Sequence, residues 1–207
     1  MDSSPMKTAV LLCGLLILAP AADGKKHDKS GDGLKNAIIL VIRHGEKPAS
    51  GPLLSPAGQA RAQAYVGYFK SFVVDSKPLK LDYLFAAADS KESQRPRLTI
   101  EPLGKALGLT IDDKFDVTKP QDVARAIRKK PSGKQFLICW HHAQVPQLLT
   151  TLGVDPGAVL PNGKWPNRVF GWVIQLRYDS NGHLIDAKRI EENLMPDDAD
   201  RSASRKR

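Results

Sequence analysis

Arginine and histidine side chains follow three apolar runs of the sequence. They are Arg43-His44 after the first run, Arg95 and Arg97 after the second, and His141-His142 after the third. A guanidinium group binds two oxygens of a phosphate at once, and an imidazole acts as a nucleophile or a base near neutral pH. Because no obvious buried acid would neutralise a site built from them, these residues favour a phosphorylated ligand.

The three apolar runs predict the strands that position these side chains. Residues 36–43 form a continuous, largely β-branched run, which is typical of a strand buried on both faces of a parallel sheet. Residues 83–88 and 135–140 are largely apolar and predict two further buried strands. In open α/β sheets, ligands bind outside the carboxyl ends of the strands. The three sets of side chains are therefore expected to meet in one pocket.

Helix signals stand between these strands. Ser55 as the N-cap and Pro56 at the first position predict a helix to about Phe72. Its buried face is expected to include Ala60, Ala64, Val66 and Phe69. Later helices are predicted up to residue 106, where Gly108 provides a stop, and over 120–128 and 145–152.

The alternation of strands and helices predicts the fold class. A short strand is expected at 109–111, and strands at 170–178 and 184–188 flank a hairpin signal, Asp179-Ser-Asn-Gly182. The chain is predicted to be α/β, a three-layer α/β/α sandwich with a mainly parallel sheet and an antiparallel edge. Residues 36–192 are expected to form a single domain.

Four blocks of the sequence resemble the histidine phosphatase superfamily, which includes the phosphoglycerate mutases. Residues 41–46 contain its strand-end Arg-His-Gly signature, and residues 54–60 resemble the helix start that follows it. Residues 93–103 resemble its Arg…Thr-Ala-Glu-Pro-Leu block, and residues 140–146 resemble its second-histidine block. The blocks occur in the family's order across most of the domain, and this combination is far more specific than any one block.

The resemblance implies a phosphoglycerate mutase-like fold and a metal-independent phosphatase without a cofactor. His44 would attack phosphorus and become a phosphohistidine. Arg43, Arg95 and a second histidine would hold the other phosphate oxygens. The short region after Leu109 argues against mutase activity. The substrate would be a phosphorylated small molecule or a phosphoprotein, with protein phosphohistidine, sugar phosphates, nucleotides and phytate-like compounds all open.

Two positions in this assignment have alternatives. Arg95 is preferred because Thr99 follows it at the spacing of the family block, with Arg97 as the fallback. His142 is preferred as the second histidine because it matches a Trp-x-His form, whereas His141 matches the commoner Gly-His form. The other histidine would line the pocket.

The acid that protonates the leaving oxygen is not identified by the motifs. The candidates are Asp112, Asp113 and Asp116, which follow residues 93–103, together with Asp89 near the second strand and Glu46 next to the signature.

Other functions fit the sequence less well. The alternative is a non-catalytic domain that binds a phosphate ligand or a partner in the same pocket. The histidines lack the spacing of a zinc site. The net charge of +9 favours anionic partners, but no nucleic-acid-binding module is recognised.

The two ends of the chain carry separate signals. The apolar run 9–20 is too short for a stable membrane span and predicts a signal peptide, residues 1–21, cleaved near Ala21. Met1 or Met6 is the start, and the protein is expected to be exported, either periplasmic or secreted. Residues 22–35 are predicted to be a flexible leader and residues 193–207 a disordered charged tail.

Overall fold

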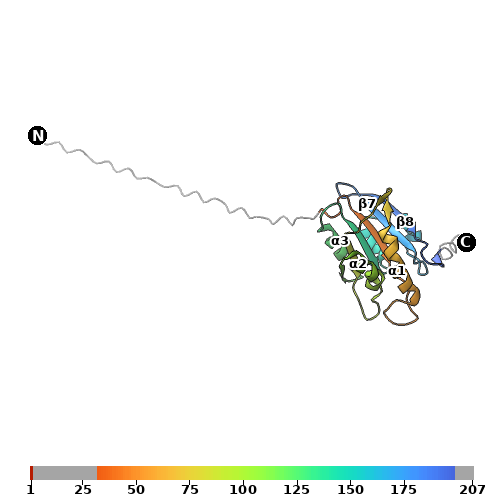
Figure 1. Ribbon diagram of the computed structural model, residues 1–207. Coiled ribbons are helices and arrows are strands. Elements are labelled where there is room, and N and C mark those ends of the chain that lie inside the picture. Colours follow the sequence, from red (N-terminus) through yellow and green to blue (C-terminus); the bar gives the residue numbers. More distant parts are fainter. Residues whose placement is uncertain (2–31, 199–207) are drawn as a thin grey trace.

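The fold is built around one six-stranded sheet, seen in a computed structural model that describes Met1 and residues 32–198. In spatial order the strands are β5 (Ile111–Phe115), β4 (Tyr83–Ala87), β6 (Gln135–Trp140), β1 (Ile38–Arg43), β7 (Trp172–Tyr178) and β8 (Leu184–Glu191). Figure 1 shows the sheet crossing the centre of the molecule. The predicted signal peptide, apart from Met1, lies outside the described residues.

Strand direction divides the sheet into two parts. β5, β4, β6 and β1 are parallel, whereas β7 is antiparallel to β1 and β8 is antiparallel to β7. The predicted fold class, a mainly parallel α/β sheet with an antiparallel edge, is confirmed. In the centre, Arg43 at the end of β1 pairs in register with Trp140 at the end of β6. This register brings His44 and His141 to the same edge of the sheet.

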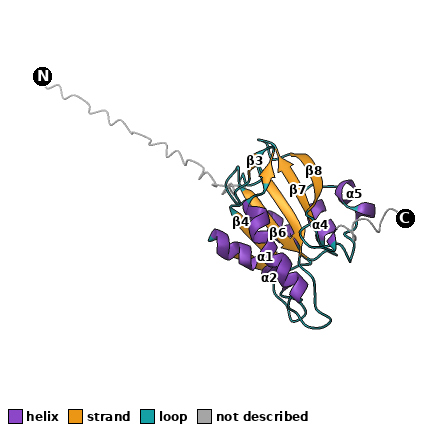
Figure 2. Cartoon of the chain, turned by 45° about the vertical axis from the view of Figure 1, so that its right-hand side comes forward, coloured by secondary structure: helices purple, strands orange, loops and turns teal. Residues whose placement is uncertain are grey.

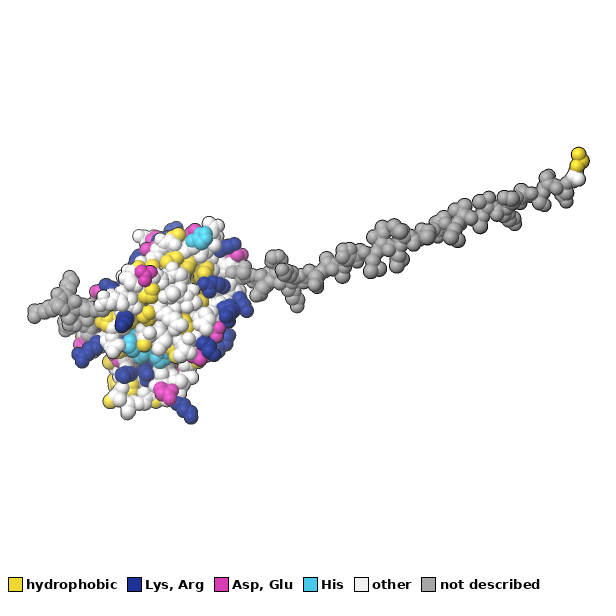
Figure 3. Space-filling view, turned by 180° about the vertical axis from the view of Figure 1, so that it is seen from behind, with side chains coloured by type: hydrophobic (Ala, Val, Ile, Leu, Met, Phe, Trp, Pro, Cys, Tyr) yellow, Lys and Arg dark blue, Asp and Glu magenta, His cyan; other side chains and the backbone are white. Residues whose placement is uncertain are grey.

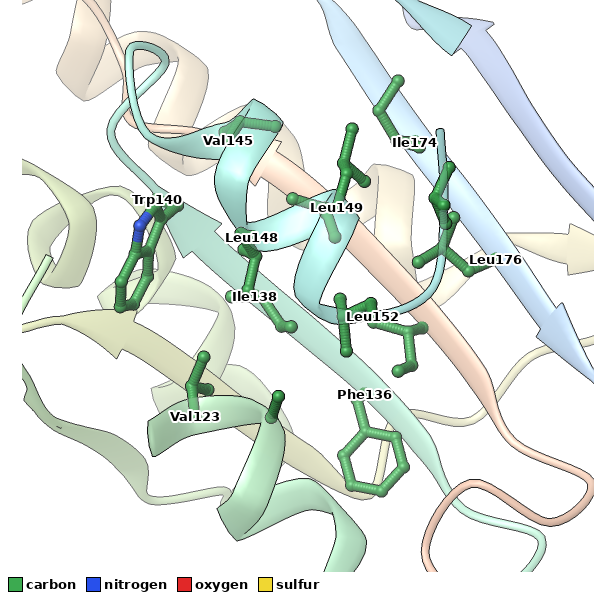
Figure 4. Close-up of a cluster of buried hydrophobic side chains, with 14 of the residues drawn as sticks. Val123, Phe136, Ile138, Trp140, Val145, Leu148, Leu149, Leu152, Ile174 and Leu176 are labelled. Atoms are coloured by element: carbon green, nitrogen blue, oxygen red, sulfur yellow. The ribbon is translucent and has the colours of Figure 1, made fainter. Parts of the chain in front are cut away.

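Helices cover both faces of the sheet. α1 (Pro56–Lys70) and α2 (Arg95–Leu107) lie over one face, as Figure 2 shows, and share a buried cluster with Leu40, Ile42 and Leu137. α3 (Pro120–Arg128) and α4 (Val145–Thr151) cover the other face. Figure 4 shows Val123 of α3 and Leu148 of α4 on either side of Ile138 of β6. The result is the predicted three-layer sandwich.

Short elements complete the chain between these parts. β2 (Val73–Val74) and β3 (Lys77–Pro78) form a small hairpin after α1. α5 (Pro156–Val159) and a single 3-10 turn (Pro161–Gly163) lie between α4 and β7. Among the described residues, no helix is long and apolar enough to span a membrane.

The start of α1 is as predicted, but its buried face is not. Ser55 caps the helix by accepting a hydrogen bond from Gly58 N at 3.2 Å. The helix ends at Lys70, and its buried residues are Gly58, Arg61, Ala62, Tyr65 and Phe69. Of the expected residues only Phe69 is fully buried, and Ala60 is exposed. Hydrophobic patterning failed here because a charged residue, Arg61, occupies the centre of the buried face.

Other element boundaries shift in the same modest way. The strand expected at 109–111 is β5, Ile111–Phe115, because its extent depends on pairing with β4. β8 extends to Glu191, beyond the predicted end, since it pairs along the whole of β7. Gly108 ends α2 in the left-handed conformation (φ 65°) as expected.

Residues on both sides of the predicted domain 36–192 pack against it. In the segment expected to be a flexible leader, Leu34 packs on the core, and a Cβ at Gly33 would lie 1.9 Å from Ile127 O. In the segment expected to be a charged tail, Asp198 is 4% exposed and its side chain contacts Arg61. The charge of Asp198 is thus paired inside the domain. Residues 22–31 and 199–207 lie outside the described residues.

Candidate active site

The His44 imidazole is held in one orientation by the backbone around it. His44 N donates to Trp140 O at 3.0 Å, which fixes the residue to the end of β6. The Nδ1 atom lies 2.7 Å from Gly45 O. A carbonyl oxygen only accepts, so Nδ1 carries the proton and Nε2 keeps its lone pair. This is the tautomer that a nucleophilic histidine requires.

Close packing against α1 and α2 fixes the loop after His44. Gly45 N donates to Thr99 Oγ1 at 2.8 Å, and Thr99 Oγ1 donates to Arg95 O at 2.7 Å. A Cβ at Gly58 of α1 would lie 2.5 Å from Glu46 O. Glycine at this position therefore allows α1 to approach the loop. These contacts join the first three sequence blocks, which are residues 41–46, 54–60 and 93–103.

Arg43 is anchored through one of its terminal nitrogens. Nη1 donates to three carbonyl oxygens of the segment before β7, those of Pro166, Asn167 and Val169, at 2.9–3.1 Å. The guanidinium carbon lies 3.9 Å from the centroid of the Phe170 ring. Burial lowers the pKa of Arg43 to about 9 while Glu46 raises it, so the side chain remains charged at neutral pH.

The structure separates the two candidate arginines of α2. Arg95 is buried, donates to Gly51 O at 3.1 Å, and its charge lowers the pKa of both His44 and His141. Arg97 instead forms ion pairs with Asp89, Glu101 and Asp113 at 2.9–3.6 Å. Residues two apart on a helix point in different directions, and here only Arg95 faces the histidines.

The adjacent histidines differ in distance and in bonding. The ring centroid of His141 lies 5.0 Å from that of His44, whereas His142 lies 6.4 Å away. His142 Nδ1 lies 3.2 Å from Arg43 Nη2, and His142 Nε2 lies 2.9 Å from Asn167 Oδ1. Within residues 32–198, neither ring nitrogen of His141 has a hydrogen-bond partner. This geometry favours His141 as the second histidine, against our sequence-based preference for His142.

Burial and positive charge keep the imidazoles neutral. Burial, with added repulsion from Arg43, His141 and Arg95, lowers the pKa of His44 to about 3. Burial, followed by the charge of Arg95, lowers the pKa of His141 to about 4. The pKa of His142 is lowered as well, by burial and by Arg43. On the face in Figure 3, histidine side chains gather beside Lys and Arg side chains.

These lowered pKa values predict that acid destabilises the protein. Histidine in the unfolded chain binds a proton below about pH 6.5, whereas folded His44 and His141 bind one only near pH 3 and 4. The unfolded chain thus holds more protons between these values, so the free energy of unfolding falls as the pH drops from 6.5. Urea unfolding at about pH 7 and about pH 5 measures this loss. A His44→Asn, His141→Asn double variant should lose less stability, and an unchanged loss contradicts this origin.

Each candidate proton donor is held by another partner. Asp112 pairs with Lys114, Asp89 and Asp113 pair with Arg97, and Asp116 accepts from Thr118. Glu46 pairs with Arg61 at 2.8 Å. Across residues 32–198, no hydrogen bond or ion pair joins His44 to a carboxylate. Nor does this part of the chain gather three or more His, Cys, Asp or Glu side chains as a metal site would.

Several residues near the site were missed by the sequence analysis. Asn167 and Phe170 contact His142 and Arg43 from the segment before β7, which resembles no family block. Arg61 is buried between Glu46, Glu192 and Asp198. Its position relative to Tyr65 and Phe69, at successive intervals of four, was a signal that it shares their buried face.

Comparisons with known proteins bear on the fold. No protein-family model and no curated protein sequence matches this chain. Among solved structures, the protein histidine phosphatase SixA complexed with tungstate is similar at 16% identity and a TM-score of 0.50, over 76% of this chain and 99% of that one. A putative phosphohistidine phosphatase SixA from Agrobacterium tumefaciens is similar at 16% identity and a TM-score of 0.52, over 73% and 97%. The chain therefore has the same fold as these two SixA proteins, and this agrees with the fold that its four sequence blocks imply.

Proposed function

We propose that this protein is a phosphatase that hydrolyses phosphomonoesters through a phosphohistidine on His44. The observation that carries the proposal is the tautomer and the neutral charge of the His44 imidazole. Its Nδ1 is tied to Gly45 O, which leaves Nε2 as the lone-pair nitrogen, and burial beside cationic groups keeps the ring unprotonated. A buried, neutral and oriented imidazole is suited to nucleophilic attack.

The arginines supply the positive charge that phosphoryl transfer needs. Within residues 32–198, Arg95 donates to Gly51 O through Nη1, and Arg43 donates through Nη1 and contacts His142 through Nη2. In the proposed reaction their remaining N–H groups bind phosphate oxygens, and their fixed charges offset the charge of the transition state. In the proposed reaction these fixed charges offset the charge of the phosphoryl group electrostatically, so the reaction needs no metal.

The proposed reaction has two displacement steps. His44 Nε2 attacks phosphorus, the P–O bond to the leaving group breaks, and the departing oxygen takes a proton. Water then attacks the phosphohistidine, the P–N bond breaks, and inorganic phosphate leaves with His44 restored. Arg43, Arg95 and His141 hold the phosphoryl oxygens in both steps. A bound phosphate dianion raises the pKa of His141, since negative charge favours the protonated imidazole, which makes His141 a proton donor within the site.

The similar structures support a phosphorylated substrate without specifying it. One SixA protein is described as a protein histidine phosphatase and the other as a putative phosphohistidine phosphatase. Their likeness to this chain is one of fold, so we propose only the class: a phosphorylated small molecule or a phosphoprotein.

A substrate panel tests the proposal. The purified chain is incubated with p-nitrophenyl phosphate, sugar phosphates, nucleotides, inositol phosphates, phosphopeptides and a phosphohistidine protein, and phosphate release is measured. We expect turnover of at least one substrate and, after an alkaline quench, alkali-stable, acid-labile phosphate on the chain. Phosphate binding by calorimetry with neither turnover nor covalent phosphate would instead identify a non-catalytic binding domain.

A further inference from the structure

α1 carries a buried arginine that binds three carboxylates, one from the loop after β1 and two from the segment after β8. Arg61 is 0% exposed. Its Nη2 donates to Glu46 Oε1 at 2.8 Å and to Asp198 Oδ1 at 2.6 Å, and its Nη1 donates to Asp198 Oδ2 at 3.0 Å. Glu192 completes the group, at 3.5 Å from Nη1. Asp198 thus binds Arg61 in the bidentate geometry that gives the strongest carboxylate pairs.

Residues 193–198, which we call the C-terminal strap, are folded around this aspartate. Asp198 Oδ2 also accepts from Leu194 N and Met195 N, at 3.1 and 3.0 Å. The carboxylate lies against Gly171 just before β7, where a Cβ would be 2.7 Å from it. One side chain therefore closes the turn of the strap and docks the strap on the domain.

Arg61 also binds Glu46, which lies in the loop that follows His44. Glu46 is bound to Arg61 through both carboxylate oxygens, at 2.8–3.2 Å, and Ser55 N donates to Glu46 O at 2.9 Å. The peptide bond before Glu46 contains the Gly45 carbonyl, the group that binds His44 Nδ1. Holding Glu46 therefore holds the carbonyl that sets the tautomer of the nucleophile.

The charge states of Glu192 and Asp198 favour a link from Asp198 through Arg61 to Glu46. Burial raises the pKa of Glu192 to about 8, and Tyr65 donates to this side chain at 3.0 Å. Burial also opposes ionisation of Asp198, but its hydrogen bonds from Arg61 and the strap outweigh that effect, and the pKa of Asp198 is lowered. Asp198 is therefore the charged partner that shares Arg61 with Glu46.

We propose that Arg61 and Asp198 are positioning residues, and that the C-terminal strap acts through them, by way of Glu46 and the Gly45 carbonyl, to orient His44. This inference rests on the proposed function of His44 as the nucleophile. The strap thereby couples the last described residues of the chain to the reaction without touching the substrate.

The variant Asp198→Asn tests the proposal with little change in shape. The Asn oxygen, in the place of Oδ2, still accepts from the strap amides and from Arg61 Nη1, but the NH2 group, in the place of Oδ1, cannot accept the hydrogen bond from Arg61 Nη2. We expect kcat on the best substrate of the panel to fall about 10- to 100-fold, the scale seen when a group that orients a metal-binding histidine is removed, with KM changed less than about threefold. Nitrogen NMR of the histidines should show His44 losing its single Nδ1–H tautomer.

A matched control and a second variant make the test decisive. Asp197→Asn alters the neighbouring, exposed acid and should leave kcat and the tautomer unchanged. If Asp198→Asn does not fold, Arg61→Lys keeps a cation but loses the paired geometry, and should show the same two effects.

An unchanged kcat, or a reduced kcat with an unchanged tautomer, overturns the proposal. A wild-type chain without turnover overturns the proposed function instead, and the tautomer measurement still decides the role of Asp198.

Discussion

Replacing His44 with alanine is expected to lower kcat by at least about 10⁴-fold, the scale seen when a nucleophile is removed from an enzyme that forms a covalent intermediate. His44 is the only described histidine whose Nδ1 is bound to a backbone carbonyl and whose Nε2 remains available. His142 does not substitute for it, because both ring nitrogens of His142 are already bonded, to Arg43 and to Asn167. Phosphate release and acid-labile phosphate on the chain are the two measurements.

The controls for this variant separate chemistry from folding. His183→Ala replaces an exposed histidine in the turn between β7 and β8 and should keep wild-type kcat. His44→Ala should still bind inorganic phosphate, since Arg43 and Arg95 remain. Wild-type turnover in His44→Ala would refute the proposed function, because no other residue matches the expected nucleophile.

The second large effect is expected at His141. His141→Ala should lower kcat about 10²- to 10³-fold, as for the loss of one transition-state donor. Its ring is the nearer to His44, at 5.0 Å, and its nitrogens have no partner within residues 32–198. His142→Ala should lower kcat by about tenfold or less, because His142 acts through Arg43 and Asn167. Steady-state kinetics of the two variants on one substrate makes the comparison.

A conservative replacement sharpens this comparison. His141→Gln keeps an N–H donor on a side chain of similar reach and should recover part of the activity that His141→Ala loses. The reverse ranking, with His142→Ala nearly inactive and His141→Ala active, would restore the assignment favoured by the sequence. The fold and the role of His44 are independent of that outcome.

The sequence by itself determined the fold class and supplied the residues proposed for the site. The strands ending at Arg43 and Trp140 were predictable because a short, continuous apolar run has few other stable environments. Ser55, Pro56 and Gly108 set helix boundaries through local backbone chemistry, and this chemistry acts within a few residues. Arg43, His44 and Arg95 were identifiable because their motifs are contiguous in the chain.

Only the tertiary structure decided the partners of these residues. The preference between His141 and His142 depended on which imidazole Arg43 and Asn167 engage, and Asn167 lies far along the chain in a segment without a motif. The burial of Arg61 likewise required carboxylates that are distant in sequence, Glu192 and Asp198 among them. A charge is buried only where partners converge on it, and that convergence is a property of the folded chain, not of any short stretch of sequence.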